Sequence, residues 1–169
     1  MLARINIGSD VFKIPGLVNV DIRMAVHPDV LMDLKKLGFR DKIASEVHMG
    51  NVLEHLPMED VSQALSECKR ILVDPGVLYL TVPLVDVAQE CFERGEITQD
   101  ALSHIINGEN EGYNHHRAEY RRGDLERVLL LNGFRTEPLN LNTFPYLVVS
   151  NCLDPKPDPW QYGVKAFKL

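Results

Sequence analysis

Short apolar runs alternate with polar turns through the first half of the chain. The runs are rich in β-branched residues, and most of them end in a glycine, an acid or an asparagine. Runs of this kind are typical of buried strands that lead into loops. The pattern predicts strands at residues 3–7, 17–21, 30–33, 46–50 and 77–82.

A helical spacing of apolar residues lies between the fourth and fifth of these strands. Pro57 lies near its start, and acids follow that favour the positive end of a helix dipole. The turn sequence at residues 74–76, Asp-Pro-Gly, predicts that the helix ends there. Four apolar residues recur on one face of this helix: Val61, Leu65, Cys68 and Leu72.

Helical spacing continues in the second half of the chain. It predicts helices at residues 85–94 and 98–107, divided by Gly95, and a third at 124–132. Gly133 follows the third helix at the position where a glycine commonly ends one.

The remaining segments are a polar loop and two late strands. Residues 108–122 carry almost no apolar side chains and predict an exposed loop. Strands are predicted at residues 135–141 and 162–167, on either side of a proline-rich connection at 154–159. Because a loop and not a helix joins these two strands, we expect them to be antiparallel.

Strands interleaved with helices predict an α/β fold, with a mostly parallel sheet flanked by helices. Nine residues separate Ile7 from Leu17, whereas a helical crossover between parallel strands needs about 10–12. We therefore expect an abbreviated first crossover, a loop or a single turn. A length of 169 residues fits one domain, residues 1–169, with residues 96–122 as a lid insertion.

The charge balance disfavours two classes of partner. The chain has 18 Lys and Arg against 24 Asp and Glu, a formal net charge of −6, and its basic residues are scattered. Proteins that hold nucleic acid through phosphate contacts usually show a basic face, so nucleic acid is disfavoured as a main partner. Anionic membrane surfaces are disfavoured on the same grounds, and no apolar run approaches the roughly 20 residues of a membrane helix.

The cysteines and the first residues indicate a reduced compartment. Cys68, Cys91 and Cys152 lie far apart and show neither zinc-ribbon nor disulfide spacing. The first ten residues enter a strand-like pattern without the apolar core of a signal peptide. We expect a cytoplasmic domain, and the pattern favours no particular oligomeric state.

Several polar residues follow directly on the predicted strands. In parallel sheets, ligands bind beyond the carboxyl ends of the strands, where Gly8, Asp21, Asp33 and Asn51 fall. A glycine lets the backbone turn tightly under a ligand, and an acid at a strand end can accept hydrogen bonds from ribose hydroxyls. Taken alone, the glycine fits a plain turn equally well, and each acid fits a solvated loop position better, so their coincidence carries the prediction of a nucleoside cleft.

The spacing disfavours a dinucleotide site in that cleft. Such sites need three glycines that open a helix, but Gly8 is followed by Ser9 and Asp10. Asp10 would place a negative charge where a phosphate lies. A nucleoside without phosphate remains compatible with the pattern.

Taken together, these motifs resemble the class I S-adenosylmethionine (SAM) dependent methyltransferases, in the compact branch of methyltransferase type 11. The likeness covers about residues 3 to 140 and implies a Rossmann-like sheet with SAM as cofactor. The segments that carry it are Asn6-Ile7-Gly8-Ser9, Pro15-Gly16-Leu17-Val18-Asn19-Val20-Asp21, Asp33-Leu34, Asn51-Val52-Leu53-Glu54-His55-Leu56, Cys68 to Gly76, Val82-Pro83, Tyr113-Asn114-His115-His116 and Leu129 to Phe134.

The resemblance implies a role for each matching residue. Gly8 and Ser9 would pass beneath the methionine part of SAM, and Asp21 would bind the ribose hydroxyls. The implied adenine neighbours are Asp33 and Leu34, and Asn51 and Val52 would close over the cofactor.

Asp10 departs from the family pattern, which usually has a second glycine there. Its carboxylate would either pair with the ammonium of SAM or crowd the turn. An acidic pocket agrees in sign with SAM, which carries a sulfonium and an ammonium against one carboxylate.

Two histidines are candidates for the chemistry. His55 follows the fourth strand on the expected ligand side, where it could serve as a base or simply pack at a helix start. His115 lies on the polar loop with His116, and we interpret that loop as facing the substrate. Adjacent histidines point to different sides of an extended chain, so we expect no metal site from the spacing.

We therefore expect a SAM-dependent methyltransferase that acts on a small-molecule or glycan-like acceptor. The alternative is a non-catalytic binding module that kept the fold and lost the cofactor through Asp10 and the short first connection. A third reading is an enzyme that binds another nucleoside in the same cleft.

Overall fold

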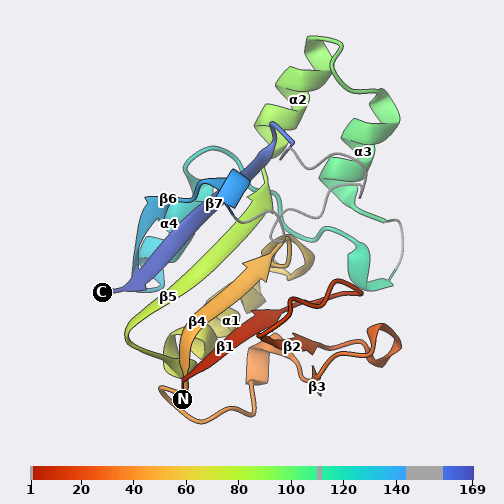
Figure 1. Cartoon of the computed structure of the whole chain (residues 1–169). Coiled ribbons are helices and arrows are strands. Elements are labelled where there is room, and N and C mark those ends of the chain that lie inside the picture. The colour runs from red at the N-terminus through yellow and green to blue at the C-terminus, as the bar shows by residue number, and fades with distance from the viewer. Residues whose placement is uncertain (1, 110–111, 144–157) are drawn as a thin grey trace.

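A computed structural model describes residues 2–109, 112–143 and 158–169, which form a seven-stranded sheet of order β3-β2-β1-β4-β5-β7-β6 (Figure 1). The pairs from β3 to β5 are parallel, and β7 runs antiparallel to both of its neighbours. The strands are β1 Ala3–Ile7, β2 Val18–Asp21, β3 Val30–Leu31, β4 Ala44–Gly50, β5 Leu72–Pro83, β6 Phe134–Pro138 and β7 Gln161–Lys168. The expected fold class is confirmed, including the antiparallel end of the sheet and the abbreviated first crossover.

Four α-helices are described: α1 Met58–Ile71, α2 Val85–Glu93, α3 Gln99–Asn107 and α4 Asp124–Leu131. Short 3-10 turns take the place of helices after β2, β3 and β4: η1 Met24–Val26, η2 Leu34–Lys36 and η3 Leu53–His55. Figure 1 shows α1 and α4 behind the sheet, and α2 and α3 beyond the carboxyl end of β5. No helix among the described residues is long and apolar enough to cross a membrane.

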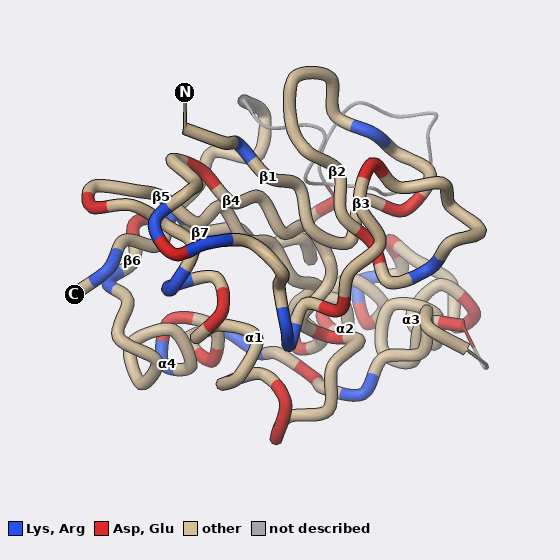
Figure 2. Tube along the Cα trace, turned by 90° about the horizontal axis from the view of Figure 1, so that it is seen from below, with Lys and Arg blue, Asp and Glu red and all other residues tan. Residues whose placement is uncertain are grey.

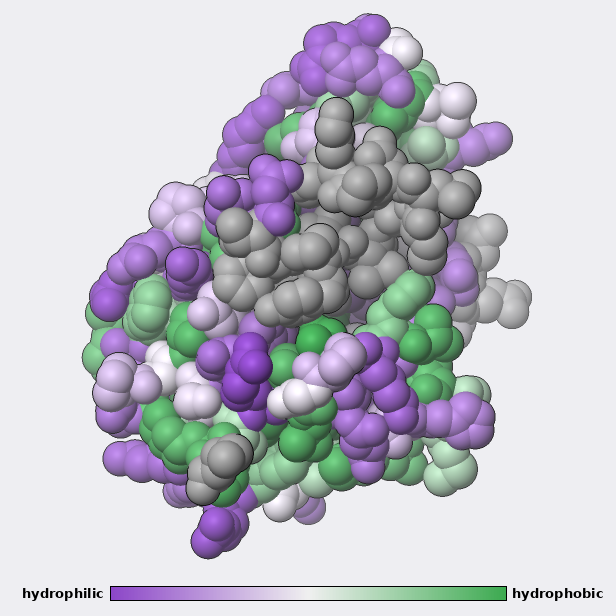
Figure 3. Space-filling view, in the orientation of Figure 1, coloured by the Kyte–Doolittle hydropathy of each residue, from purple (hydrophilic) through white to green (hydrophobic). Residues whose placement is uncertain are grey.

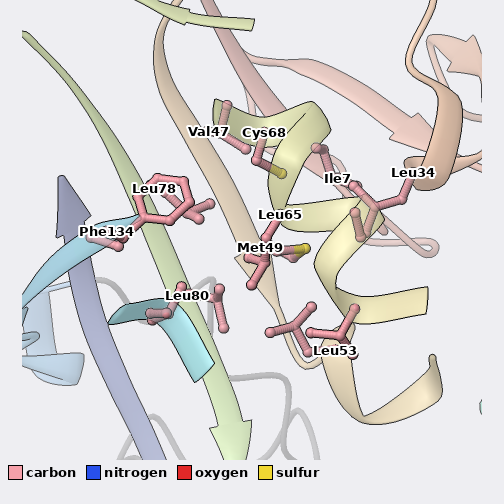
Figure 4. Packing of buried hydrophobic residues seen from close by; sticks show 14 of the residues in the cluster. Ile7, Leu34, Val47, Met49, Leu53, Leu65, Cys68, Leu78, Leu80 and Phe134 are labelled. Carbon is pink, nitrogen blue, oxygen red and sulfur yellow. The ribbon is translucent and has the colours of Figure 1, made fainter. Parts of the chain in front are cut away.

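The main core lies between the sheet and the face that α1 and α4 turn toward it. Leu65 and Cys68 of α1 pack against Val47 and Met49 of β4, with Leu78 of the neighbouring strand beside them (Figure 4). All of these side chains are fully buried. The apolar stripe predicted for this helix is therefore its core face, which packs against the middle strands of the sheet.

No described α-helix covers the opposite face of the sheet (Figure 1), and hydrophilic and hydrophobic residues are mixed on the side of the molecule that Figure 3 shows. Because successive side chains of a strand point to opposite sides, the residues that alternate with the core residues point to this face. Here Arg4 donates to Glu46 at 2.8 Å, Glu46 lies 2.9 Å from Nε2 of His48, and His48 stacks on Tyr79. Polar side chains on this face therefore bind one another, since no described α-helix packs against them.

Two predictions are corrected by the structure. The segment 74–76 does not form a turn after the helix: α1 ends at Ile71, and 74–76 lies within β5, where the pairing with β4 shifts register. The segment 108–122 is not simply an exposed loop, because Ala118 and Tyr120 are buried. Most of the predicted proline-rich connection, residues 154–157, lies outside the described residues.

The side chain of Asn19 holds the first connection in place of a crossover helix. Its Oδ1 accepts from Asn6 Nδ2 at 3.0 Å and from the N–H of Ile14 at 2.9 Å. Its Nδ2 donates to the carbonyl of Leu17 at 3.1 Å and to Asp29 Oδ2 at 2.8 Å. Hydrogen bonds from the backbone and side chain of Asn19 lower the pKa of Asp29 to about 2. One buried amide thus joins β1, β2 and the segments on both sides of β2.

We expect Asn19→Ala to lower the free energy of unfolding by about 3 kcal/mol, because it leaves several buried partners unsatisfied. Urea denaturation measures the change. As a matched control, Asn142→Ala removes an exposed asparagine and should shift stability by less than about 0.5 kcal/mol. Equal stability of the two variants would contradict the role given to Asn19.

Candidate functional site

A cavity of about 880 Å³ opens beyond the carboxyl ends of β1, β2 and β4. Its described lining includes nine residues that the sequence singled out: Gly8, Ser9, Asp10, Asp21, Asp33, Leu34, Asn51, Val52 and His55. His115 is exposed and lies outside the described lining, whereas its neighbours Asn114 and His116 both line the cavity. The structure therefore brings the predicted residues together around one space, with the exception of His115.

The turn after β1 requires a glycine at position 8. Gly8 has a φ of +69°, and a Cβ built there would lie 2.4 Å from Val52 Cγ2. The N–H groups of Gly8 and Ser9 both donate to the carbonyl of Val20, at 2.8 and 3.0 Å. The turn is thus fixed to β2 from one side and covered by Val52 from the other.

Asp10 keeps the backbone conformation of a glycine. Its φ of +47° lies in the left-handed region, which aspartate adopts more readily than most residues. Its N–H donates to Asp21 Oδ2 at 2.9 Å, and its own Oδ1 accepts from the N–H of Val11 at 2.8 Å. The chain therefore makes the tight turn here with a carboxylate added at its edge.

The carboxylate of Asp21 is buried and already bonded within the chain. Its Oδ1 accepts from the N–H of Arg23 at 2.9 Å and from Nε of Arg23 at 3.1 Å, and Oδ2 accepts from Nη2 at 3.3 Å. Burial raises the pKa of Asp21, but the bonds from Arg23 and from the N–H of Asp10 outweigh it, so the pKa lies below its ordinary value. Asp21 is ionised, and its acceptor positions are filled.

Arg23 links three parts of the cavity wall. Besides Asp21, its guanidinium contacts Asp10 Oδ1 at 3.2 Å and Asn114 Oδ1 at 3.1 Å. It thus joins the glycine turn, the end of β2 and the segment after α3. Asp21 marks this place in the sequence, but nothing in the pattern indicated that Arg23 would cover it.

The other predicted residues take structural roles that leave part of each facing the cavity. Asp33 Oδ1 accepts from the N–H of Lys35 at 2.8 Å and so begins η2, whereas Leu34 packs into the core. Asn51 has a φ of +51°, and its N–H donates to the carbonyl of Thr81 at 3.1 Å. These contacts fix the ends of β3 and β4 beside the glycine turn.

Glu54, His55 and His116 form a cluster on the cavity wall that the sequence did not predict. One ligand-type atom of each residue lies within 4.8 Å of the others, and the two rings meet edge to face at 4.9 Å. The carbonyl of Glu54 accepts from the N–H groups of Arg117 and Ala118, at 2.7 and 3.0 Å. These two bonds bring His116 across from a distant part of the chain, which no local pattern could show.

Burial controls the protonation of this cluster. It raises the pKa of Glu54 to about 8. Burial also lowers the pKa of His55, against the opposing effect of the His115 carbonyl. For His116, burial and then the nearby His55 ring lower the pKa to about 4. Both rings are therefore neutral at pH 7.

Acidic side chains outnumber basic ones around the cavity. Apart from Glu54, whose raised pKa leaves it neutral at pH 7, the described acids in its lining are Asp10, Asp21, Asp33, Asp60, Glu109 and Asp158, and the described Lys and Arg are Arg23, Lys35 and Arg117. A cavity of this sign favours a cationic ligand over a phosphate.

Comparison with known proteins agrees with this geometry. A family model described as a methyltransferase domain matches residues 15–80, which run from the first connection through most of β5. A comparison with curated proteins found no match.

Solved structures of methyltransferases share the fold at low sequence identity. A SAM-dependent methyltransferase from Thermotoga maritima aligns with a TM-score of 0.65 and 15% identity, over 99% of this chain and 82% of that chain. One from Archaeoglobus fulgidus gives 0.64 and 16%, over 99% and 86%. A Burkholderia thailandensis 1,6-didemethyltoxoflavin-N1-methyltransferase, solved with that substrate and S-adenosylhomocysteine bound, gives 0.56 and 11%, over 99% and 71%.

We expect Gly8→Ala to lower the free energy of unfolding by about 3 kcal/mol, from the left-handed backbone and the overlap with Val52 together. Adding Val52→Ala removes the overlap, so a double-mutant cycle should show a favourable coupling of at least about 1 kcal/mol. Gly16→Ala is the control, because Gly16 has a φ of +82° but open space around it. An additive cycle would show that Val52 does not cover the turn.

Proposed function

We propose that the chain is a class I SAM-dependent methyltransferase, which binds SAM in this cavity and transfers its methyl group to a small-molecule or glycan-like acceptor; the methyltransferase-domain match over residues 15–80 and the shared fold support this. The observation that carries the proposal is the meeting of the Gly8 turn and the Asp21 carboxylate at one cavity, at the ends of neighbouring parallel strands. Ligands of such sheets bind at this edge.

The lining residues fit a nucleoside cation. Gly8 and Ser9 would lie beneath the methionine part of SAM, and Asp21 would receive the ribose hydroxyls. The predominantly acidic lining suits the net positive charge of SAM. Asp33 and Leu34 would flank the adenine, and Asn51 and Val52 would close over the cofactor.

Ribose binding requires Arg23 to leave Asp21. A carboxylate offers about four acceptor positions, and the N–H groups of Arg23 and Asp10 occupy them. Asp10 holds Arg23 in that place through its own carboxylate. The residues therefore fit SAM once the Arg23 side chain has turned away.

The same observation favours one second candidate. A binding module that has lost SAM would keep the fold and fill the vacated ribose position with a side chain of its own. The Arg23 side chain fills the ribose position at Asp21 in this way, and the carboxylate of Asp10, where the family usually has a glycine, also contacts Arg23. The two candidates differ in whether SAM displaces Arg23.

A small acceptor is supported by the distribution of charge. The Lys and Arg positions are scattered along the described chain and form no continuous stripe (Figure 2). A polyanion would need such a stripe for its phosphates. We accordingly propose an acceptor that the cavity itself encloses, without nucleic acid as a partner.

For the transfer, the chain would hold the two reactants in line and provide a proton acceptor. SAM supplies an electrophilic methyl group, which an in-line acceptor takes as the carbon–sulfur bond breaks. Most of the rate enhancement in such a transfer comes from holding the reactants in line. Neutral His55 lines the cavity and could take the proton that the acceptor loses. We propose no role for the side chain of His115.

Calorimetry with SAM and with its demethylated product tests the proposal. We expect micromolar binding to the native chain and at least about a tenfold loss for Asp21→Asn, since a charged hydrogen bond contributes about 1.5–3 kcal/mol. Asp41→Asn, an exposed acid outside the described lining, should bind as the native chain does. Absence of heat and of a thermal shift at millimolar ligand would favour the binding module.

Arg23→Ala separates the two candidates further. It frees the acceptor positions of Asp21, so we expect SAM to bind at least about fivefold more tightly than to the native chain, as titration calorimetry would show. Asp10→Gly should act in the same direction, because it removes a second anchor of Arg23 and restores the open turn. A loss of affinity in Asp10→Gly would instead show that Asp10 pairs with the ammonium of SAM.

A further inference from the structure

We propose that Glu54, His55 and His116 bind a divalent transition-metal ion, of the Zn²⁺, Mn²⁺, Fe²⁺ or Co²⁺ class, on the wall of the cavity. The three side chains come from η3 and from the segment after α3, which the carbonyl of Glu54 joins by two hydrogen bonds. The inference goes beyond methyl transfer, since it concerns ligand atoms that would bind an ion with or without SAM.

The spacing of the three atoms suits a single ion. One ring nitrogen of His55, one of His116 and a carboxylate oxygen of Glu54 all lie within 4.8 Å of one another. Ligands bonded to one ion at about 2.1 Å lie about 3–4 Å apart. Closing around an ion therefore needs side-chain shifts of about 1 Å, without rearrangement of the backbone.

The hydrogen bonds of the two rings prepare them as ligands. Nδ1 of His55 faces the carbonyl of His115 at 3.3 Å, and Nδ1 of His116 faces the carbonyl of Ile105 at 3.0 Å. A carbonyl can only accept, so each neutral ring carries its proton on Nδ1 and keeps a lone pair on Nε2. Metal-binding histidines are usually oriented by a second-shell bond of this kind.

The carboxylate of Glu54 provides an independent sign of a missing ligand. The residue is almost completely buried, and its Oε2 has no hydrogen-bond partner within the described chain. Buried polar atoms of native proteins are nearly always paired, so an orphaned carboxylate oxygen indicates an absent proton, water or ion. With two ring nitrogens within 4.8 Å of it, an ion would complete this donor set in place of the side chain's proton.

The chemistry of the donor set limits which ion fits. One carboxylate with two imidazoles suits transition metals, whereas Ca²⁺ and Mg²⁺ prefer sites made of oxygen alone. Three protein ligands on the wall of an open cavity leave at least one coordination position for water or for a ligand in the cavity. With an ion bound, His55 would hold the metal and would no longer serve as a free base.

Titration of the full chain with Co²⁺ after dialysis against a chelator tests the proposal. We expect visible absorption bands that saturate at one equivalent, and loss of the bands when Zn²⁺ is added. Glu54→Gln and His116→Gln should each weaken Co²⁺ binding at least tenfold. His115→Gln is the matched control, because it alters an exposed histidine next to His116 and should bind as the native chain does.

Three results would overturn the proposal. The first is no saturable absorption with Co²⁺, and the second is full binding by Glu54→Gln and His116→Gln. The third is an equal loss of Co²⁺ binding in His115→Gln, which would indicate that exposed histidines bind the ion. If Glu54→Gln proves unfolded by circular dichroism, His116→Gln decides alone. Because no SAM is present in this titration, its outcome is separate from that of the cofactor calorimetry.

Discussion

The hydrogen bonds of one buried amide, that of Asn19, hold the amino-terminal half of the sheet together. In most parallel sheets a crossover helix connects neighbouring strands and covers a face at the same time. Here the link from β1 to β2 has no helix, and Asn19 ties it to Asn6, Ile14 and Asp29. Directional bonds of the chain therefore replace the burial that a helix would have contributed, and they place the glycine turn at the cavity.

The face of the sheet opposite α1 and α4 is stabilised by polar contacts. The face without a described α-helix carries a chain of polar contacts through Arg4, Glu46, His48 and Tyr79. His48 is fully buried, and burial lowers its pKa in spite of the bond from Glu46. Polar contacts thus occupy this face of the sheet, and the apolar core lies on the face toward α1 and α4.

Local patterns predicted the strands and helices well, because each apolar run has the period of one element. They failed where the outcome depends on distant partners. Residues 74–76 have turn chemistry, yet they lie within β5, between Leu72 and Val77, whose pairing with β4 continues on both sides of a register shift. The polar segment containing Tyr120 is held inward by the carbonyl of Glu54. For the same reason, sequence reasoning placed Asp21 and His55 near the cavity but could not choose His116 over His115 or foresee Arg23.

The N–H groups of Arg117 and Ala118 donate to the carbonyl of Glu54, and these bonds connect two ends of the cavity: the Asp21 carboxylate and the His55–His116 pair. The segment that they fix also carries Asn114, which holds Arg23 against Asp21. A displacement of the segment from Asn114 to Ala118 would therefore change the contacts of Arg23 with Asp21 and the contact between His55 and His116. If occupation of one end changes affinity at the other, thermodynamic reciprocity requires the same factor in both directions. A single stretch of backbone thus contacts both ends of this enclosure.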